Sequence, residues 1–233
     1  MDILTGTSGF SYQEWKGAFY PEKLPGSEML RFYASRLRSV EINNTFYRMP
    51  GADMLAAWAE QVPEHFRFAV KASRRITHSK RLKDAADETR FLLSRLEALG
   101  AKLGAILFQL PPHLKKDLPR LRDFLALLPP ATPAAFEFRD ASWREDDVLA
   151  ALQESNAAWC VADTDDQESA AIATASWGYL RLRRSAYPAE ALAAWVRRLH
   201  GEPWTHAFVF FKHEDAGAGP RLAAELERLA ASP

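Results

Sequence analysis

The run Val40-Glu41-Ile42-Asn43 carries the feature that decides the fold: a short apolar segment that ends in a polar or charged side chain. The same pattern recurs in Phe68-Ala69-Val70-Lys71, Leu107-Phe108-Gln109, Phe136-Glu137-Phe138-Arg139, Val161-Ala162-Asp163, Leu180-Arg181-Leu182-Arg183 and Phe210-Phe211-Lys212-His213. Short apolar runs bounded in this way are typical of buried strands. If the strands are parallel and close into one barrel, their polar ends meet at one mouth, where such barrels keep their active sites.

Strand patterns alternate with helical patterns along the whole sequence. Strands are predicted near 3–7, 39–43, 66–71, 104–109, 134–139, 158–163, 178–183 and 206–212. Helices are predicted near 28–38, 53–61, 84–99, 118–128, 146–156, 188–200 and 216–231. Strict alternation indicates a parallel sheet, and eight strands indicate a single-domain TIM-type (βα)8 barrel over residues 1–233. The segment 164–177 between strands six and seven is expected to be an irregular loop.

Composition limits the classes of function. The chain has 233 residues, with 30 Lys and Arg against 30 Asp and Glu, so no global charge attracts it to nucleic acid or to an anionic membrane. The single cysteine, Cys160, lies in an apolar strand pattern, which fits a reducing compartment. Neither a secretory signal nor a run of 18 apolar residues is present, so a cytoplasmic protein without a membrane partner is expected. The oligomeric state is not predicted.

Side chains on a strand alternate between two faces, so Glu41 and Asn43 share the barrel interior, as do Glu137 with Arg139 and Arg181 with Arg183. We predict catalytic roles for Glu41, Lys71 and Glu137. The two carboxylates are candidates for general acid-base chemistry, and Lys71 for charge binding or for attack as an amine. The alternative is that these charges form a structural ion network that fills the barrel.

The remaining predicted site residues are assigned to substrate binding. They are Asn43, Tyr47, His78, Gln109, Arg139, Trp143, Asp163, Arg181, Arg183, Lys212 and His213. Arginine side chains suit bidentate binding of phosphate or carboxylate, so a small anionic ligand is the expected partner. Tyr12, Tyr47 and Trp143 are expected to be exposed in the pocket, whereas Trp15, Phe19 and Phe46 are expected to pack. The basic segment 74–83 is read as a solvated loop.

Cofactors and metals receive little support. Gly6-Thr7-Ser8-Gly9 lacks the glycine spacing of a dinucleotide-binding turn and the Lys of a phosphate-binding loop. The six histidines show no close paired spacing. A metal site built from Glu41, Asp163 and His213 remains an alternative, and neither a metal nor a cofactor is predicted.

Several of these segments resemble the domain-of-unknown-function 72 (YecE-like) family. The matching blocks include Gly6-Thr7-Ser8-Gly9-Phe10-Ser11-Tyr12, Val40 to Arg48, Leu103 to Pro112, Glu137-Phe138-Arg139, Ser142-Trp143 and Tyr179-Leu180-Arg181. The resemblance implies a TIM-type barrel and no established reaction. The family's Arg-x-His-Gly after strand seven is replaced here by Arg181-Leu182-Arg183-Arg184, and its Phe-Asn-Asn after strand eight by Phe211-Lys212-His213. Both changes add cations at the expected mouth.

Three classes of function follow. The first is an enzyme, such as a hydrolase, isomerase or lyase, that acts on a small phosphorylated or carboxylated substrate by carboxylate acid-base chemistry. The second is a nucleic-acid-binding or phosphodiester-processing protein, in which the segment 74–83 holds phosphates and exposed aromatic rings stack on bases. The third is a non-catalytic ligand-binding or interaction module.

Overall fold

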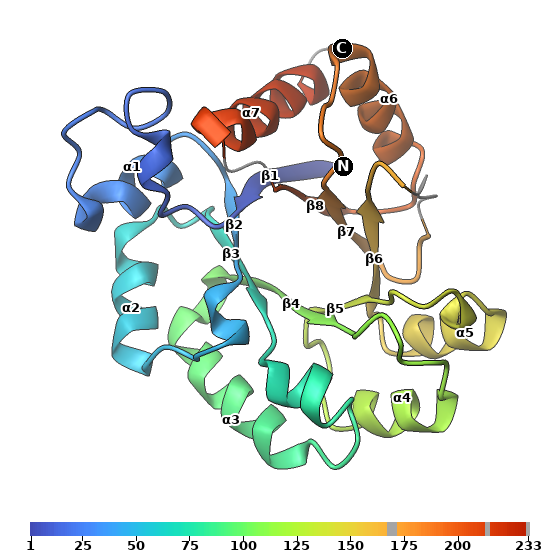
Figure 1. Cartoon of the computed structure of the whole chain (residues 1–233). Coiled ribbons are helices and arrows are strands. Elements are labelled where there is room, and N and C mark those ends of the chain that lie inside the picture. The colour runs from blue at the N-terminus through green and yellow to red at the C-terminus, as the bar shows by residue number, and fades with distance from the viewer. Residues whose placement is uncertain (167–171, 213–214, 232–233) are drawn as a thin grey trace.

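Eight parallel strands form a closed barrel in the order of the sequence. The computed structural model describes residues 1–166, 172–212 and 215–231. The strands are β1 (Asp2–Ser8), β2 (Ser39–Ile42), β3 (Arg67–Lys71), β4 (Leu103–Gln109), β5 (Ala134–Glu137), β6 (Ala158–Asp163), β7 (Trp177–Leu182) and β8 (His206–Phe211). β8 closes the sheet by lying beside β1 (Figure 1). In this pair Phe208 stands opposite Leu4. The predicted closed parallel barrel is confirmed.

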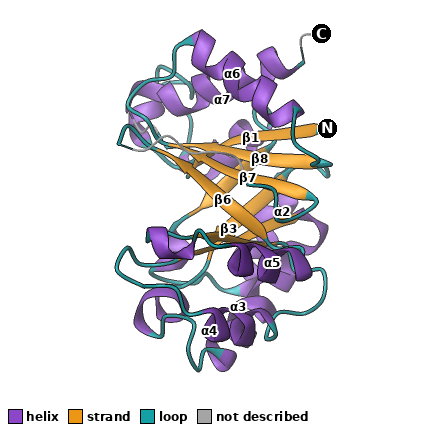
Figure 2. Ribbon diagram, turned by 90° about the vertical axis from the view of Figure 1, so that its right-hand side faces the viewer, coloured by secondary structure: helices purple, strands orange, loops and turns teal. Residues whose placement is uncertain are grey.

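Helices surround the strands, as Figures 1 and 2 show from two directions. They are α1 (Met29–Ala34), α2 (Ala52–Gln61), α3 (Ala86–Leu96), α4 (Leu118–Leu125), α5 (Asp146–Glu154), α6 (Ala189–His200) and α7 (Ala218–Ala230). Most lie within a few residues of the predicted ranges. α1 is shorter than predicted, because the helix ends at Ala34 and residues 35–38 form a turn that leads into β2, while Glu28 belongs to the 3-10 turn η2 (Gly26–Glu28). In the described part of 164–177 no helix occurs, and residues 167–171 lie outside the described residues.

Short helical turns follow several strands and shape the mouth. They are η1 (Gln13–Trp15), η3 (Asn44–Phe46), the π-helical turn η4 (Arg75–Ser79), η6 (Ala141–Trp143) and η7 (Asp215–Gly217). The sequence pattern did not predict them, because three to five residues are too few to show a helical period. η3 and η4 place side chains above β2 and β3, beside the predicted site.

The barrel interior is filled by side chains of unequal size. Alanines from β3 to β6 form one wall, and aromatic rings from β7 and β8 fill the space opposite them. The interior residues include Ala69, Ala105, Ala135, Ala158, Trp177, Tyr179, Phe208 and Phe210. A Cβ added at Gly104 would lie 2.7 Å from Cζ of Phe208, so glycine is needed on that part of the wall. The packed rings leave room for polar side chains only toward the strand ends.

Alternate residues on the same strands form a second core outside the barrel. Val40, Ile42, Phe136, Leu180 and Leu182 are buried in the layer that packs against the helices. This is the assignment of faces that strand alternation predicted, and it leaves the neighbouring charged residues to the interior. Among the described helices, none has the length and apolar character needed to cross a membrane.

Candidate functional site

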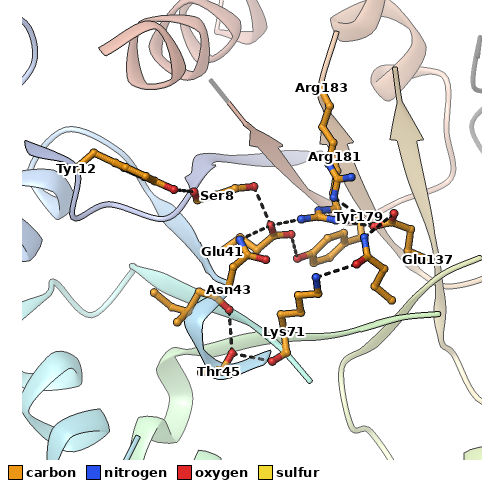
Figure 3. Close-up of polar contacts among 12 residues, drawn as sticks. Ser8, Tyr12, Glu41, Asn43, Thr45, Lys71, Glu137, Tyr179, Arg181 and Arg183 are labelled. Carbon is orange, nitrogen blue, oxygen red and sulfur yellow. Dashed lines mark hydrogen bonds and ion pairs between the residues drawn. The ribbon is translucent and has the colours of Figure 1, made fainter. Parts of the chain in front are cut away.

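The centre of the candidate site is one arginine held between two glutamates (Figure 3). Arg181 on β7 donates from Nη2 to Oε1 of Glu41 at 2.8 Å and from Nη1 to Oε2 of Glu137 at 2.6 Å. The exposed fractions of the three side chains are 3%, 0% and 2%. The alternation of side chains along β2, β5 and β7 places all three residues in the barrel interior, as the sequence predicted. Because this unit carries two negative charges and one positive charge, it favours a further cation nearby.

Glu41 is surrounded by donors. Ser8 Oγ and Asn43 Nδ2 donate to Oε1 at 2.8 and 3.0 Å, and the Tyr179 hydroxyl donates to Oε2 at 2.7 Å. Burial alone would raise the pKa of Glu41, but the charge of Arg181 and the hydrogen bonds from Asn43, Arg181 and Tyr179 outweigh it and lower the pKa below 4.5. Glu41 is therefore a fixed carboxylate with its oxygens already occupied.

Gln109 at the end of β4 connects Lys71 to Glu137. Lys71 Nζ donates to Gln109 Oε1 at 2.8 Å, and Gln109 Nε2 donates to Glu137 Oε1 at 2.8 Å. The amide thus uses its acceptor toward the cation and its donor toward the carboxylate. Lys71 Nζ also lies 4.2 Å from the centre of the Phe46 ring, which is a cation-π contact.

The surroundings of Lys71 make its ammonium group lose a proton more easily than that of an ordinary lysine. Burial lowers its pKa below 10.5, and the nearby charges of Arg181 and Arg139 act in the same direction, against the attraction of Glu137 and Glu41. The side chain is half-buried, so it belongs to the accessible part of the site, unlike Arg181. Lys71 is the predicted catalytic residue that a ligand can reach most directly.

Further basic side chains lie around Lys71 at the mouth. His78 in η4 stands edge-on to Phe46, with ring centres 4.9 Å apart, and burial together with Lys71 and Arg139 lowers its pKa below 6.5. Arg139, just after β5, is exposed. Arg183 reaches Glu137, with Nη2 3.5 Å from Oε2. Mutual repulsion among these groups would be relieved by a bound anion.

Two predicted binding residues lie away from this cluster, and their assignment to the mouth is corrected. Asp163 faces the outer layer, where it accepts hydrogen bonds from Arg184 Nη2 at 2.9 Å and the Tyr187 hydroxyl at 2.8 Å. Its position on β6 places it one residue out of phase with the interior. Trp143 is 0% exposed, and its Nε1 donates to the carbonyl of Leu114 at 2.7 Å. The expectation that Trp143 is exposed in the pocket is wrong, because its ring packs on Phe138.

Two further predicted binding residues, Tyr47 and Lys212, are exposed to solvent. Tyr47 is 76% exposed, and Lys212 after β8 is also exposed. His213 lies outside the described residues. Phe46 was expected to pack. Its ring does pack against Tyr47 and His78, and Lys71 Nζ lies over its face.

The alternative metal site of Glu41, Asp163 and His213 is not supported by the positions of Glu41 and Asp163. Glu41 faces the barrel interior, whereas Asp163 faces the outer layer. In the described part of the chain, no group of three or more His, Cys, Asp and Glu side chains could hold a metal ion. Cys160 is buried in the interior, and burial raises the pKa of its thiol well above 9.0.

Ser8, Thr45 and Tyr179 were missed at the sequence level. Thr45 Oγ1 donates to the carbonyl of Lys71 at 2.7 Å and so ties η3 to the end of β3. Tyr179 stands two residues before Arg181 on the same strand, so the parity that placed Arg181 inside the barrel also places this hydroxyl there. Ser8 ends β1 and gave no such signal, because serine is common at strand ends and in turns.

Cavities lie at both ends of the barrel. One of about 500 Å³ adjoins the site and is lined in part by Phe10, Tyr12, Asn43 and Trp58. Another of about 650 Å³ lies at the opposite end and is lined by residues at strand starts, among them Leu103 and Trp177. The second cavity is lined by none of the predicted site residues. The active sites of such barrels lie at the carboxyl ends of the strands, which is the end that holds the first cavity.

Two curated proteins are similar in sequence to part of this chain. The UPF0759 protein YecE of Escherichia coli K12 is 33% identical over 128 residues, which cover 54% of this chain and 44% of that protein. The UPF0759 protein YunF of Bacillus subtilis 168 is 32% identical over 150 residues, covering 60% and 52%. The chain therefore spans about half the length of the curated relatives it matches.

Solved structures match over nearly the full chain. A DUF72 family protein from Thermotoga maritima has a TM-score of 0.81 at 24% identity, with 100% of both chains covered. One from Enterococcus faecalis has a TM-score of 0.82 at 19% identity, with 99% and 96% covered. These identities support the fold alone. The model of the family described as "Protein of unknown function DUF72" matches residues 4–233, so the chain belongs to the DUF72 family.

Proposed function

We propose that the protein is an enzyme that binds a small phosphorylated or carboxylated substrate at the mouth of the barrel, with Lys71 exchanging a proton with it. One observation carries the proposal: half-buried Lys71 and His78 both contact the ring of Phe46 at the mouth, and exposed Arg139 lies near enough for its charge to lower the pKa of each. Cations gathered in this way gain most from an anionic ligand.

The buried residues support this role indirectly. Glu41 has its oxygens occupied by four donors and a lowered pKa, so it is poorly suited to accept a proton from substrate. Its role in the proposal is to hold Arg181, while Glu137 orients Gln109 and, through it, Lys71. Lys71 has a pKa below that of an ordinary lysine and an accessible position, and both properties make it better suited to act as a general acid or base than a fully solvated lysine.

Ligand binding and turnover test the proposal separately. Thermal shifts and calorimetry with a panel of phosphorylated and carboxylated metabolites should find at least one that stabilises the protein. Arg139→Gln should weaken that binding about tenfold, the size expected for one charge-assisted contact. Arg228→Gln, which removes an exposed arginine paired with Glu225 on α7, is the control and should leave binding unchanged. Lack of stabilisation by every anion tested would reject the proposal.

Lys71→Gln distinguishes an enzyme from a non-catalytic binding module. If a turnover reaction is found with the bound metabolite, this variant should lose most of it. A protein that binds the ligand without any turnover would instead be a binding module.

Nucleic-acid binding receives no specific support from the basic segment 74–83. Glu88 on α3 pairs with Lys80 at 2.8 Å and with Arg75 at 3.4 Å, so part of the positive charge is neutralised within the chain. We therefore advance only the small-anion function.

A further inference from the structure

A separate cavity of about 500 Å³ lies beside the cationic mouth, on the side of β1 and β2. The loop after β1, the turn η2 and the end of α2 enclose it. Its volume is within the range of pockets that hold small metabolites. Asn43 connects it to the site, because this residue lines the cavity and donates to Glu41 at 3.0 Å.

The lining of the cavity differs in kind from that of the mouth. Phe10, Tyr12 and Trp58 contribute half-buried aromatic rings, and Asn43, Asn44 and Gln61 contribute amide groups. Among the described residues that line it, none is charged. A cavity of this kind suits a neutral group with many hydroxyls and some apolar C–H surface, since amides pair with hydroxyls and ring faces attract C–H groups.

The aromatic rings are held in place by the surrounding structure. Trp58 stacks on Phe68 with ring centres 6.5 Å apart and meets the edge of Phe10 at 6.2 Å. The Tyr12 hydroxyl donates to the carbonyl of Ser8 at 2.6 Å, as Figure 3 shows. Gly9 has a φ of +94°, and a Cβ there would lie 2.6 Å from the Tyr12 hydroxyl, so glycine is required for this arrangement.

We propose that this cavity binds the sugar ring of a phosphorylated sugar. The inference rests on the proposed function for the phosphate, which the cations at the mouth hold, and it adds the chemical class of the rest of the substrate. Asn43 lies at the junction of the two parts, and the backbone N–H of Gly9 donates to the carbonyl of Glu41 at 2.8 Å, which fixes the cavity wall against β2. The sugar therefore lies over Phe10, Tyr12 and Trp58.

The test measures how much affinity the sugar adds to the phosphate. The probes are glucose 6-phosphate, mannose 6-phosphate and ribose 5-phosphate, each compared with its unphosphorylated sugar and with inorganic phosphate, using the full chain. At least one sugar phosphate should bind about tenfold more tightly than inorganic phosphate. Saturation-transfer NMR should show contact between its ring C–H protons and aromatic side chains of the protein.

Variants locate the added affinity. Trp58→Leu removes a ring from the cavity, and Gln61→Glu places a negative charge in it. Each should remove most of the preference for the sugar phosphate over inorganic phosphate while leaving phosphate binding unchanged. Gln153→Glu makes the same chemical change at an exposed position on α5 and serves as the matched control. If Trp58→Leu does not fold, Gln61→Glu decides.

The possible failures are distinguishable. Sugar phosphates that bind no more tightly than inorganic phosphate, or a preference that survives both cavity variants, would overturn the sugar site and leave the anion site standing. Binding of sugars to the cavity without binding of any anion would reject the proposed function instead. An absence of both kinds of binding would overturn both.

Discussion

At the scale of single residues, Arg181 supplies the positive charge that stabilises two buried carboxylates in the barrel interior. Two buried carboxylates, Glu41 and Glu137, share its guanidinium, and such ions are very unfavourable without a partner. Because the three side chains are buried, a ligand cannot reach them directly. Their role is to hold the residues around them in fixed positions. Asn43 is connected to Arg181 by two contacts through Glu41, and Lys71 is connected to it by three contacts through Gln109 and Glu137.

Arg181→Gln should lower the free energy of unfolding by about 3–5 kcal/mol at pH 7, because it removes the buried cation that the two carboxylates share and leaves Glu137 only the more distant Arg183. In the wild type the pKa of Glu41 is lowered, so its stabilising contribution is present above pH 4.5 and is lost as the pH falls through the folded-state pKa. In the variant, burial without Arg181 raises that pKa, so the destabilisation should shrink as the pH is lowered toward 5. Urea unfolding at several pH values measures this difference.

The control for Arg181→Gln is Arg122→Gln, which removes an exposed ion pair with Glu154. It should change stability little at either pH, because water screens exposed pairs. A difference between wild type and Arg181→Gln that did not vary with pH would contradict the account of Glu41.

Lys71 should titrate at lower pH than an ordinary lysine. Burial and the charges of Arg181 and Arg139 lower its pKa, so the resonance of the reductively 13C-methylated side chain should have a midpoint below 10.5. Lys71→Arg identifies the resonance by its absence. Adding an anion that binds at the mouth should raise the midpoint, and a midpoint at or above 10.5 in the free protein would contradict the prediction.

At the scale of elements, β1 and β2 lie so close together that only glycine fits between them. A Cβ at Gly6 would lie 2.0 Å from the carbonyl oxygen of Ser39. Gly6→Ala should therefore lower the free energy of unfolding by about 1–3 kcal/mol, the usual range for overpacking, or by more if the strands cannot separate. Chemical denaturation measures it.

Gly51→Ala is the matched control for Gly6→Ala. Gly51 precedes α2, and a Cβ there would meet nothing within 4 Å. Its stability should stay close to that of the wild type. Equal stabilities for the two variants would show that β1 and β2 can move apart without loss.

Strands were predicted more accurately than turns. The ends of β3 and β4 fall on Lys71 and Gln109, where the apolar runs end in polar residues. By contrast, η3 and η4 could not be predicted, although they bring Phe46 and His78 to Lys71. Their conformation depends on contacts such as the hydrogen bond from Thr45 Oγ1 to the carbonyl of Lys71, which joins residues far apart in the sequence.

At the scale of the whole molecule, the closed sheet makes the two ends of the chain depend on each other. β8 pairs with β1, and the aromatic rings of β7 and β8 pack on alanines from β3 to β6. We therefore expect residues 1–233 to unfold as one domain. Far-ultraviolet circular dichroism and the fluorescence of the seven tryptophans, which are spread from Trp15 to Trp204, should show the same midpoint in urea. Separate midpoints would indicate two independently folding parts.

The sequence by itself determined the barrel, its strand order and the face on which Glu41, Lys71, Glu137 and Arg181 lie. Hydrophobic periodicity is a local property, and alternation along each strand follows directly from backbone geometry. Asp163, the polar residue that ends β6, does not share this face, because it is one residue out of phase with Ala158 and Cys160 in the interior.

Only the tertiary structure decided which charges neutralise one another and which are accessible. It buried Arg181 between two glutamates, left Lys71 half-buried, enclosed Trp143 and formed the uncharged cavity beside Asn43. These outcomes depend on distances between strands and turns that are far apart in the sequence, and on the competition between burial and ion pairing at each group. A sequence pattern fixes the direction of a side chain, whereas its partners and its access to solvent are set by the closed barrel.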